Sequence, residues 1–294
     1  RNPAYCCGIA SLKPSIGRLP FVNSIEPFID MGIASAFITD GPMARSVRDA
    51  AILLQTLSGH DARDPVSLRT TPPDFLDGLG ERIQNLKIAW SLDLGYAAVD
   101  PEVAQITYEA VKVFDQLGCT LEEPDFHLEN PTPAFMDIFY TNNCVSYGHL
   151  LPEHADELSD NGRFCLEHGA NVTGVELAQA LRFVEAMRGR LDDLMETYDL
   201  LITPTMAVPP FPVGQFPDRI GGQEVSQRGG YTPFTRAFNL SGQPAASIPC
   251  GFSAEDLPIG LHIIGRRGEE ARVLHASAAF EEARPWAQRR PPIE

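Results

Sequence analysis

A strand–helix–strand pattern near the middle of the sequence limits the possible folds more than any other feature. The run "LKIAW" (86–90) is short and apolar, as is typical of a buried strand, and "CTLEE" (119–123) is a second strand-like run. Between them, "DPEVAQITYEAVKVFDQLG" (100–118) has apolar residues at helical spacing, with Asp100 placed to cap a helix and Gly118 placed to end it. Strands joined through a helix pair in parallel, so the pattern predicts an α/β fold.

The rest of the sequence extends this unit. Apolar runs and helical spacing predict strands at 199–205, 245–249 and 259–265 and helices at 175–198 and 269–283. The stretch 206–230 is rich in Pro and Gly and has little periodicity, so we expect a long surface loop there. The whole pattern predicts a mixed β-sheet covered by helices, in one domain over residues 1–294.

A further helix is predicted over "TDGPMARSVRDAAILLQTLSG" (39–59). Thr39 or Asp40 would cap it, Pro42 suits its first turn, and Gly59 would end it. The residues expected to face the core from one stripe of this helix are Met43, Val47, Ala50, Ala51, Leu54 and Leu57.

The charge balance argues against two classes of partner. The formal charge is −16, and the acidic residues are spread along the chain. Such a surface repels nucleic-acid phosphates and anionic lipids, and the pair Arg289–Arg290 is too short to form a basic patch. No apolar run approaches the roughly 18 residues of a membrane-spanning helix. We therefore expect no nucleic-acid partner and no membrane association.

The cysteines suggest a reducing compartment. They occupy positions 6, 7, 119, 144, 165 and 250, and no two of them form a C-x-x-C pair. Buried, reduced thiols are the simplest interpretation, and they favour a cytoplasmic location.

Common catalytic and metal-binding motifs are absent from the sequence. It contains no G-x-S-x-G, H-E-x-x-H, G-x-x-x-x-G-K-[ST] or strand-linked G-x-G-x-x-G pattern. Its seven histidines are scattered, and none has a second histidine at metal-ligand spacing. The residues by themselves therefore identify no active site, and we expect no metal and no cofactor.

Several ordered segments resemble the amidase signature family. These are "RNPAYCCGIASLKPSIGRLP", "TDGPMARSVRDAAILL", "DLLITPT", "FNLSGQPAASIPCGF", "LPIGLHIIGR" and the closing "AAFEEARPW". The resemblance spans essentially all 294 residues. It implies the amidase signature fold, incomplete at its N-terminal side, and hydrolysis of a carbon–nitrogen bond through an acyl-enzyme. The family's catalytic set is a nucleophilic Ser, a second Ser in a cis peptide linkage and a Lys.

The same resemblance places that catalytic set before Arg1. The family's segment Gly-Gly-Ser-Ile-Arg-x-Pro-Ala is matched at its end by Arg1, Pro3 and Ala4, so the nucleophile would lie two residues upstream of Arg1. Neither Lys13, in the family's structural "LKP" landmark, nor the other two lysines match the catalytic Lys. We therefore expect no catalytic residue in this chain, and no activity from it alone.

The resemblance also implies a set of supporting and substrate-binding residues. The supporting residues near the nucleophile turn would be Arg1, Asn2, Thr39 and Asp40, and the residues lining the acyl pocket would be Thr235, Phe238 and Asn239. Structural alternatives stay open at this point. Arg1 could be a frayed terminus, Asn2 a surface residue, Thr39 and Asp40 a helix cap, and Phe238 ordinary core.

Two departures bear on the substrate. Amidotransferase relatives that release ammonia from glutamine for misacylated tRNA carry an Asp seven residues before the Asn of "FNLSG", where this chain has Thr232. Their carboxylate-binding Arg has no clear match, although Arg163 lies nearby in the sequence. These departures favour a stand-alone amidase acting on a small-molecule amide, in an assembly that could be a homodimer. The alternatives are the ammonia-releasing subunit of a glutamyl/aspartyl-tRNA amidotransferase and a non-catalytic pseudoenzyme or binding subunit.

Overall fold

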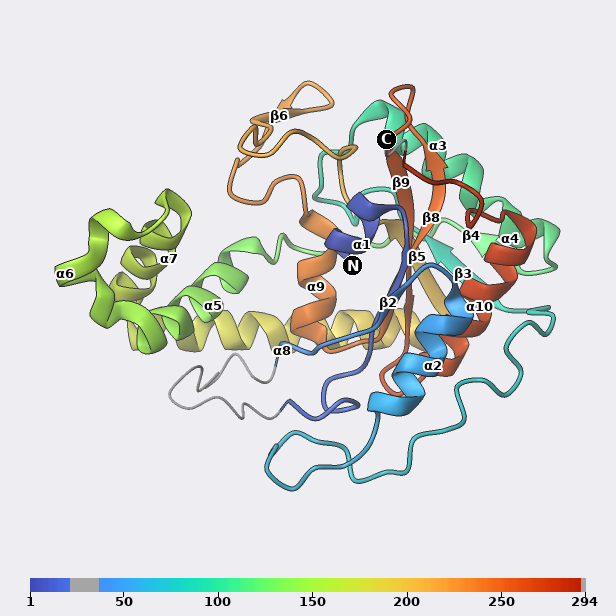
Figure 1. The fold of residues 1–294 in the computed structure, drawn as a ribbon, viewed down its shortest axis with the longest axis horizontal. Coiled ribbons are helices and arrows are strands. Elements are labelled where there is room, and N and C mark those ends of the chain that lie inside the picture. Colours follow the sequence, from blue (N-terminus) through green and yellow to red (C-terminus); the bar gives the residue numbers. More distant parts are fainter. Residues whose placement is uncertain (22–36, 292–294) are drawn as a thin grey trace.

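A seven-stranded mixed sheet forms the centre of the molecule in the computed structural model, which describes residues 1–21 and 37–291 (Figure 1). In spatial order its strands are β2 (Met43–Ala44), β1 (Ala10–Lys13), β8 (Ala245–Phe252), β9 (Pro258–Gly265), β5 (Leu200–Pro204), β3 (Lys87–Trp90) and β4 (Thr120–Glu122). The α/β class and the mixed sheet predicted from sequence are confirmed.

The strand–helix–strand unit forms as predicted. Strand β3 pairs in parallel with both β4 and β5, whereas the remaining pairs in this sheet are antiparallel. Helix α3 (Pro101–Val111) and the short α4 (Val113–Gln116) connect β3 to β4. The side chain of Asp100 accepts hydrogen bonds from the backbone N–H groups of Glu102 and Val103, so the predicted cap is confirmed.

Helices cover both faces of the sheet. One face packs against α1 (Asn2–Cys7), α2 (Val47–Leu57), α3, α4 and α10 (Glu270–Ala283), and the other packs against α5 (Thr132–Tyr147), α8 (Gly174–Thr197) and α9 (Pro233–Ser241). Successive strand residues alternate between the two cores, as with Ile88 and Ala89 or Leu200 and Leu201. Because helices bury both faces of the sheet, both alternating sets of side chains lie in a core, and the central strands are therefore apolar throughout.

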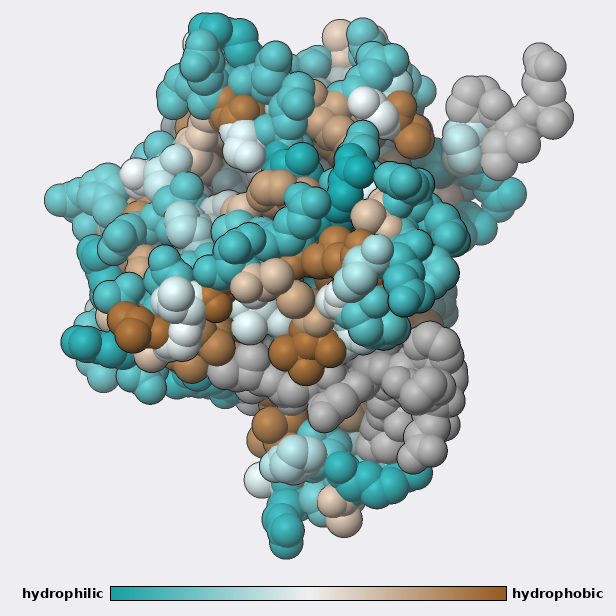
Figure 2. Space-filling view, turned by 90° about the vertical axis from the view of Figure 1, so that its left-hand side faces the viewer, coloured by the Kyte–Doolittle hydropathy of each residue, from teal (hydrophilic) through white to brown (hydrophobic). Residues whose placement is uncertain are grey.

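The end of the molecule farthest from α2 and α10 is helical. Helix α5 leads into α6 (Leu151–His154) and α7 (Asp160–Asn171), and Figure 1 shows these three to one side of the sheet. Figure 2 looks onto this end, where hydrophilic side chains predominate and hydrophobic ones are scattered among them. No helix in the described residues has the length and apolarity needed to cross a membrane.

The predicted helix at 39–59 is wrong in its first third. Helix α2 begins after Ser46, whose side chain accepts a hydrogen bond from the N–H of Asp49, and neither Thr39 nor Asp40 caps it. The preceding Met43–Ala44 instead pairs with β1 as the edge strand β2, and Leu12 N–H donates to Pro42 O at 3.1 Å. Sheet hydrogen bonds therefore outcompete the helical propensity of this segment.

Glycine at position 41 is needed for this close approach, because a Cβ there would lie 2.1 Å from Leu12 O. The predicted core stripe is correspondingly shorter than expected. Met43 and Leu57 at its two ends are 40% and 51% exposed, whereas the four residues between them are buried.

Two smaller expectations need correction. The 206–230 loop contains a short hairpin, β6 (Arg219–Ile220) and β7 (Gln223–Glu224), whose turn glycines 221 and 222 both have positive φ. All six cysteines are free thiols, but Cys6 and Cys7 are exposed rather than buried, and Cys144 is partly exposed. Cys6 and Cys7 are the last two residues of α1, which Gly8 caps.

Replacing Ser46 with Ala should lower the free energy of unfolding by about 1 kcal/mol, because the first turn of α2 loses its side-chain acceptor. Urea titration followed by circular dichroism would measure it. Thr39→Ala and Asp40→Ala are matched controls and should change stability by less than about 0.5 kcal/mol. A loss in the Asp40 variant with none in the Ser46 variant would contradict the observed start of α2.

Candidate functional site

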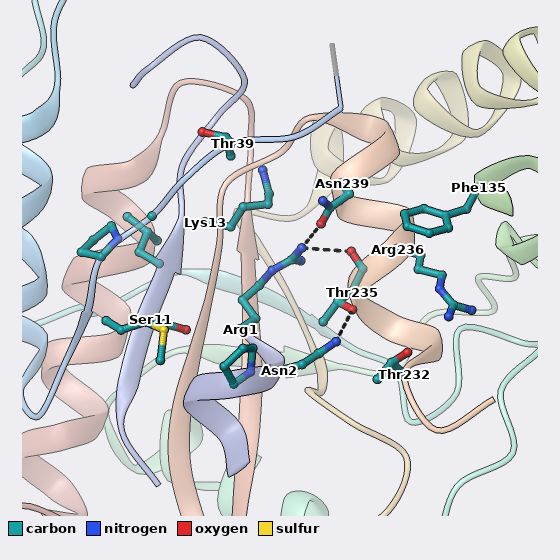
Figure 3. Close-up of a pocket in the computed structure, with 15 residues that line it drawn as sticks. Arg1, Asn2, Ser11, Lys13, Thr39, Phe135, Thr232, Thr235, Arg236 and Asn239 are labelled. Carbon is teal, nitrogen blue, oxygen red and sulfur yellow. Dashed lines mark hydrogen bonds between the residues drawn. The ribbon is translucent and has the colours of Figure 1, made fainter. Parts of the chain in front are cut away.

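A cavity of about 400 Å³ lies between the N-terminal segment, the edge of the sheet and helix α9 (Figure 3). Its wall is built from α1, β1, the segment from Thr39 to Met43, Phe135 of α5, and one face of α9. Of the residues expected at the site, Arg1, Asn2, Thr39, Thr235 and Asn239 line this cavity.

The Arg1 guanidinium joins three elements at the cavity wall. Its Nη2 donates to Thr235 O at 3.1 Å and also to Asn239 Oδ1, both on α9. Its Nη1 lies 3.1 Å from Nε2 of His262 on β9. Arg1 is therefore anchored rather than frayed, and burial lowers the pKa of its guanidinium.

Asn2 and Asn239 extend this network. The Asn2 amide donates to Thr235 Oγ1 at 3.3 Å, and the Asn239 amide donates to Phe37 O at 3.2 Å. Asn2 Oδ1 is buried and has no hydrogen-bond partner among the described residues. A buried acceptor without a partner is costly, so this oxygen is available to a ligand or to a further segment of protein.

Helical periodicity explains which α9 residues reach the cavity. Positions 232, 235, 236 and 239 follow the spacing i, i+3, i+4, i+7 and share one face, and all four line the cavity. Phe238 lies on another face. It is fully buried in the second core, with its ring 5.3 Å from the His262 ring in an edge-to-face arrangement.

Two residues expected near the site are therefore not part of the cavity wall. Phe238 belongs to the core, and Asp40 is exposed and outside the lining, although its neighbour Thr39 is part of it. Conversely, sequence reasoning did not assign Ser11, Lys13, Phe135 and Arg236 to the site. For Ser11 and Lys13 the sequence spacing was a usable signal, because residues i and i+2 of a strand point to the same face of the sheet.

The imidazole of His262 helps to hold the Arg1 guanidinium in place. Because arginine only donates, His262 Nε2 accepts the Arg1 hydrogen bond, which leaves the proton on Nδ1, 3.5 Å from Thr203 Oγ1. The side chain is fully buried. Burial, together with the positive charges of Arg1 and Lys13, holds the pKa of His262 well below 6.5, so the ring is neutral.

Lys13 is a buried amine at the cavity. It is 6% exposed, and its Nζ donates to Pro14 O at 2.6 Å. Burial and then the Arg1 charge lower its pKa well below 10.5, against an opposing effect of Glu270. Ser11 on the same strand has a buried Oγ without a hydrogen-bond partner among the described residues, so these two do not form a bonded nucleophile–base pair.

The charge of the cavity is opposite to that of the chain. Arg1, Lys13 and Arg236 line it, and none of the described lining residues is Asp or Glu. Within residues 1–21 and 37–291, no group of three His, Cys, Asp or Glu side chains is arranged to hold a metal ion. The described residues thus offer hydrogen-bond donors, positive charge and an aromatic wall, which are means of binding and orienting a polar ligand.

Phe238→Ala should cost about 3–5 kcal/mol of unfolding free energy, because it opens a hole in a packed core. Chemical denaturation measures the loss. Thr235→Val is the matched control from the cavity face of the same helix and should cost about 1 kcal/mol, the value of one hydrogen bond. Equal and small losses for both variants would contradict the core position of Phe238.

His262 should make the protein less stable in mild acid. Its folded pKa lies below the unfolded value of 6.5, so below that pH the unfolded chain binds a proton that the folded chain does not. Above about pH 6.5 His262 is neutral in both states and does not lower the free energy of unfolding. Below that pH the free energy of unfolding falls as the pH falls. Between pH 7 and pH 5 the wild type should lose more unfolding free energy than His262→Gln, up to the limit of about 2 kcal/mol that the unfolded pKa sets. The exposed His60→Gln is the control and should behave as wild type.

Comparisons with known proteins agree with this architecture. The family model described as Amidase matches residues 1–274. An acylamidase of Rhodococcus erythropolis is 30% identical over 99% of this chain and 60% of its own length. A glutamyl-tRNA(Gln) amidotransferase subunit of Oceanobacillus iheyensis is 30% identical over all of this chain and 63% of its own length.

Among solved structures, a bacterial aryl acylamidase of the amidase signature enzymes superposes with a TM-score of 0.89 at 29% identity, over 98% of this chain and 61% of that one. The chain thus spans about three fifths of the length of these relatives. The matched family model, the sequence relatives and the shared fold together show that this chain belongs to the amidase signature family.

Proposed function

We propose that this chain supplies the substrate-binding wall of an enzyme that hydrolyses the carbon–nitrogen bond of small linear amides. The observation that carries the proposal is the anchoring of Arg1 by Asn239, Thr235 and His262 at the edge of a polar cavity. In the family pattern the nucleophilic Ser precedes this Arg by two residues. Anchoring Arg1 would therefore direct that Ser toward the cavity.

The proposed reaction is acyl transfer. The Ser oxygen attacks the amide carbon, a neutral Lys takes the Ser proton through the second Ser, and that proton passes to the leaving amine. Water then hydrolyses the acyl-enzyme by the reverse proton path. These three residues and the oxyanion donors would lie outside this chain, and the chain's own Thr235, Asn239 and Phe135 would hold the acyl group.

The cavity favours an amidase over a glutamine amidotransferase. Glutamine carries an α-ammonium group, which needs an acceptor of negative charge. At the position where the amidotransferases carry Asp, Thr232 lines the cavity and its hydroxyl bonds to Gly229 O at 3.4 Å. Among residues 1–21 and 37–291 no carboxylate lines the cavity, and Arg163 lies on α7, where it is bonded to Asp160, and is not part of the lining. The acylamidase names of two relatives point the same way.

The test is an assay of the product of the intact reading frame that contains this sequence, with an acyl anilide and with glutamine. We expect metal-independent anilide hydrolysis that survives dialysis against a chelator, and a much slower release of ammonia from glutamine. The 294-residue chain alone should be at least about 10⁴-fold slower, because it would lack the nucleophile.

Three outcomes would contradict the proposal. Preferential glutamine hydrolysis would favour the amidotransferase, and no hydrolysis of any amide by the intact product would favour a pseudoenzyme. Robust turnover by the 294-residue chain would show that the nucleophile lies within it.

A further inference from the structure

Arg236 is a partly buried cation that the network around Arg1 does not use. It is one of the residues of α9 that line the cavity. In Figure 3 its side chain lies beside Phe135, and α9 separates both from Arg1 and Lys13. Its Nη1 donates to Thr132 Oγ1 at 3.1 Å and its Nη2 to Arg228 O at 3.3 Å. Both partners are neutral oxygens.

The chain builds a specific place for this guanidinium. Gly229 has φ of 131°, and a Cβ at that position would lie 1.6 Å from Nη2 of Arg236. The Phe135 ring lies 5.2 Å from the guanidinium carbon on another side. A fixed position between a glycine, an aromatic ring and two oxygens holds the planar group in one orientation.

No carboxylate balances this charge within the described residues. The ion pairs among the described residues do not include Arg236. The ionisable side chains that affect its pKa are those of Tyr140, Tyr231 and Tyr96. Burial lowers its pKa from 12.5, which reflects the cost of desolvating an unpaired cation. Desolvated charges are normally paired, so a partly buried guanidinium that lines the cavity and has no carboxylate partner among the described residues is suited to bind an anionic ligand.

We propose that Arg236 binds a carboxylate at the far end of the substrate's acyl chain, which makes monoamides of dicarboxylic acids the preferred substrates. Three N–H donors of the guanidinium remain beyond the two hydrogen bonds described, and its planar fork matches a carboxylate. The apolar part of the acyl chain packs on Phe135, and the amide lies toward Asn2 and Arg1. The assignment of the acyl side rests on the proposed function, whereas the charge complementarity does not.

The first experiment measures hydrolysis by the product of the intact reading frame. Glutaric acid monoanilide carries the carboxylate, and its methyl ester is the neutral match. The wild type should have a kcat/KM about 10- to 100-fold higher for the acid than for the ester. Arg236→Met should lower the acid-to-ester ratio of kcat/KM to about 1, whatever its effect on the rate with the ester.

Two further variants separate recognition from folding. Arg228→Met is the matched control, because that guanidinium stacks on Phe164 at 3.8 Å and lies outside the cavity lining, so its acid-to-ester ratio should equal the wild type. Arg236→Lys keeps the charge without the fork and should retain part of the preference. Melting temperatures of all variants identify any that unfold.

The second experiment measures binding to the same protein without turnover. Its probe is a ketone analogue of glutaric acid monoanilide, in which a CH2 group replaces the N–H group. Calorimetry should give a Kd about 10- to 100-fold lower for this ketone acid than for its methyl ester, and the difference should vanish in Arg236→Met. If no amide is hydrolysed but this difference is found, the proposed function falls and the carboxylate site stands. If anilides are hydrolysed while folded wild type treats acid and ester alike, the carboxylate site falls and the proposed function stands.

Discussion

The pairing of β8 with β9 is the constraint on which the rest of the molecule depends. These two eight-residue strands lie at the centre of the sheet, between β1 and β2 on one side and β5, β3 and β4 on the other. Their register sets Ser247 opposite His262, and Thr205 of the neighbouring chain segment bonds to Ser247 at 2.9 Å. The wall of the site follows from it, because β9 carries His262 and α9 runs directly into β8.

The basic side chains of the site donate their hydrogen bonds to neutral acceptors. Arg1 is bonded to a carbonyl, a side-chain amide and an imidazole, Lys13 to a carbonyl, and Arg236 to a hydroxyl and a carbonyl. Such groups satisfy hydrogen bonds without cancelling charge. Elsewhere in the chain the buried Arg18 meets Glu270 at 3.3 Å, so the lack of acidic side chains among the described lining residues is a local property. The described lining is therefore polar and rich in basic side chains, within a chain of charge −16.

Local elements with strong signals at both ends were predictable from sequence. The helix after Asp100 has a cap, a proline in its first turn and an apolar stripe, and it forms as α3 with its continuation α4. The segment at 39–46 carries similar signals but forms loop and edge strand, because β1 offers it backbone hydrogen bonds. Propensity is a local quantity, and it cannot include a partner strand whose position depends on the whole sheet.

The sequence by itself determined the α/β class, the parallel β3–β4 pair and the family resemblance, and that resemblance led us to expect Arg1, Asn2, Thr235 and Asn239 near the site. These follow from periodicity, caps and ordered motifs, which are properties of neighbouring residues. Only the tertiary structure decided that Phe238 lies in the core while Arg236 lines the cavity. The two residues lie on different faces of α9, and the packing of that helix decides which face meets the core. It also decided that His262 accepts from Arg1, since that contact spans 261 positions and exists only once the sheet has formed.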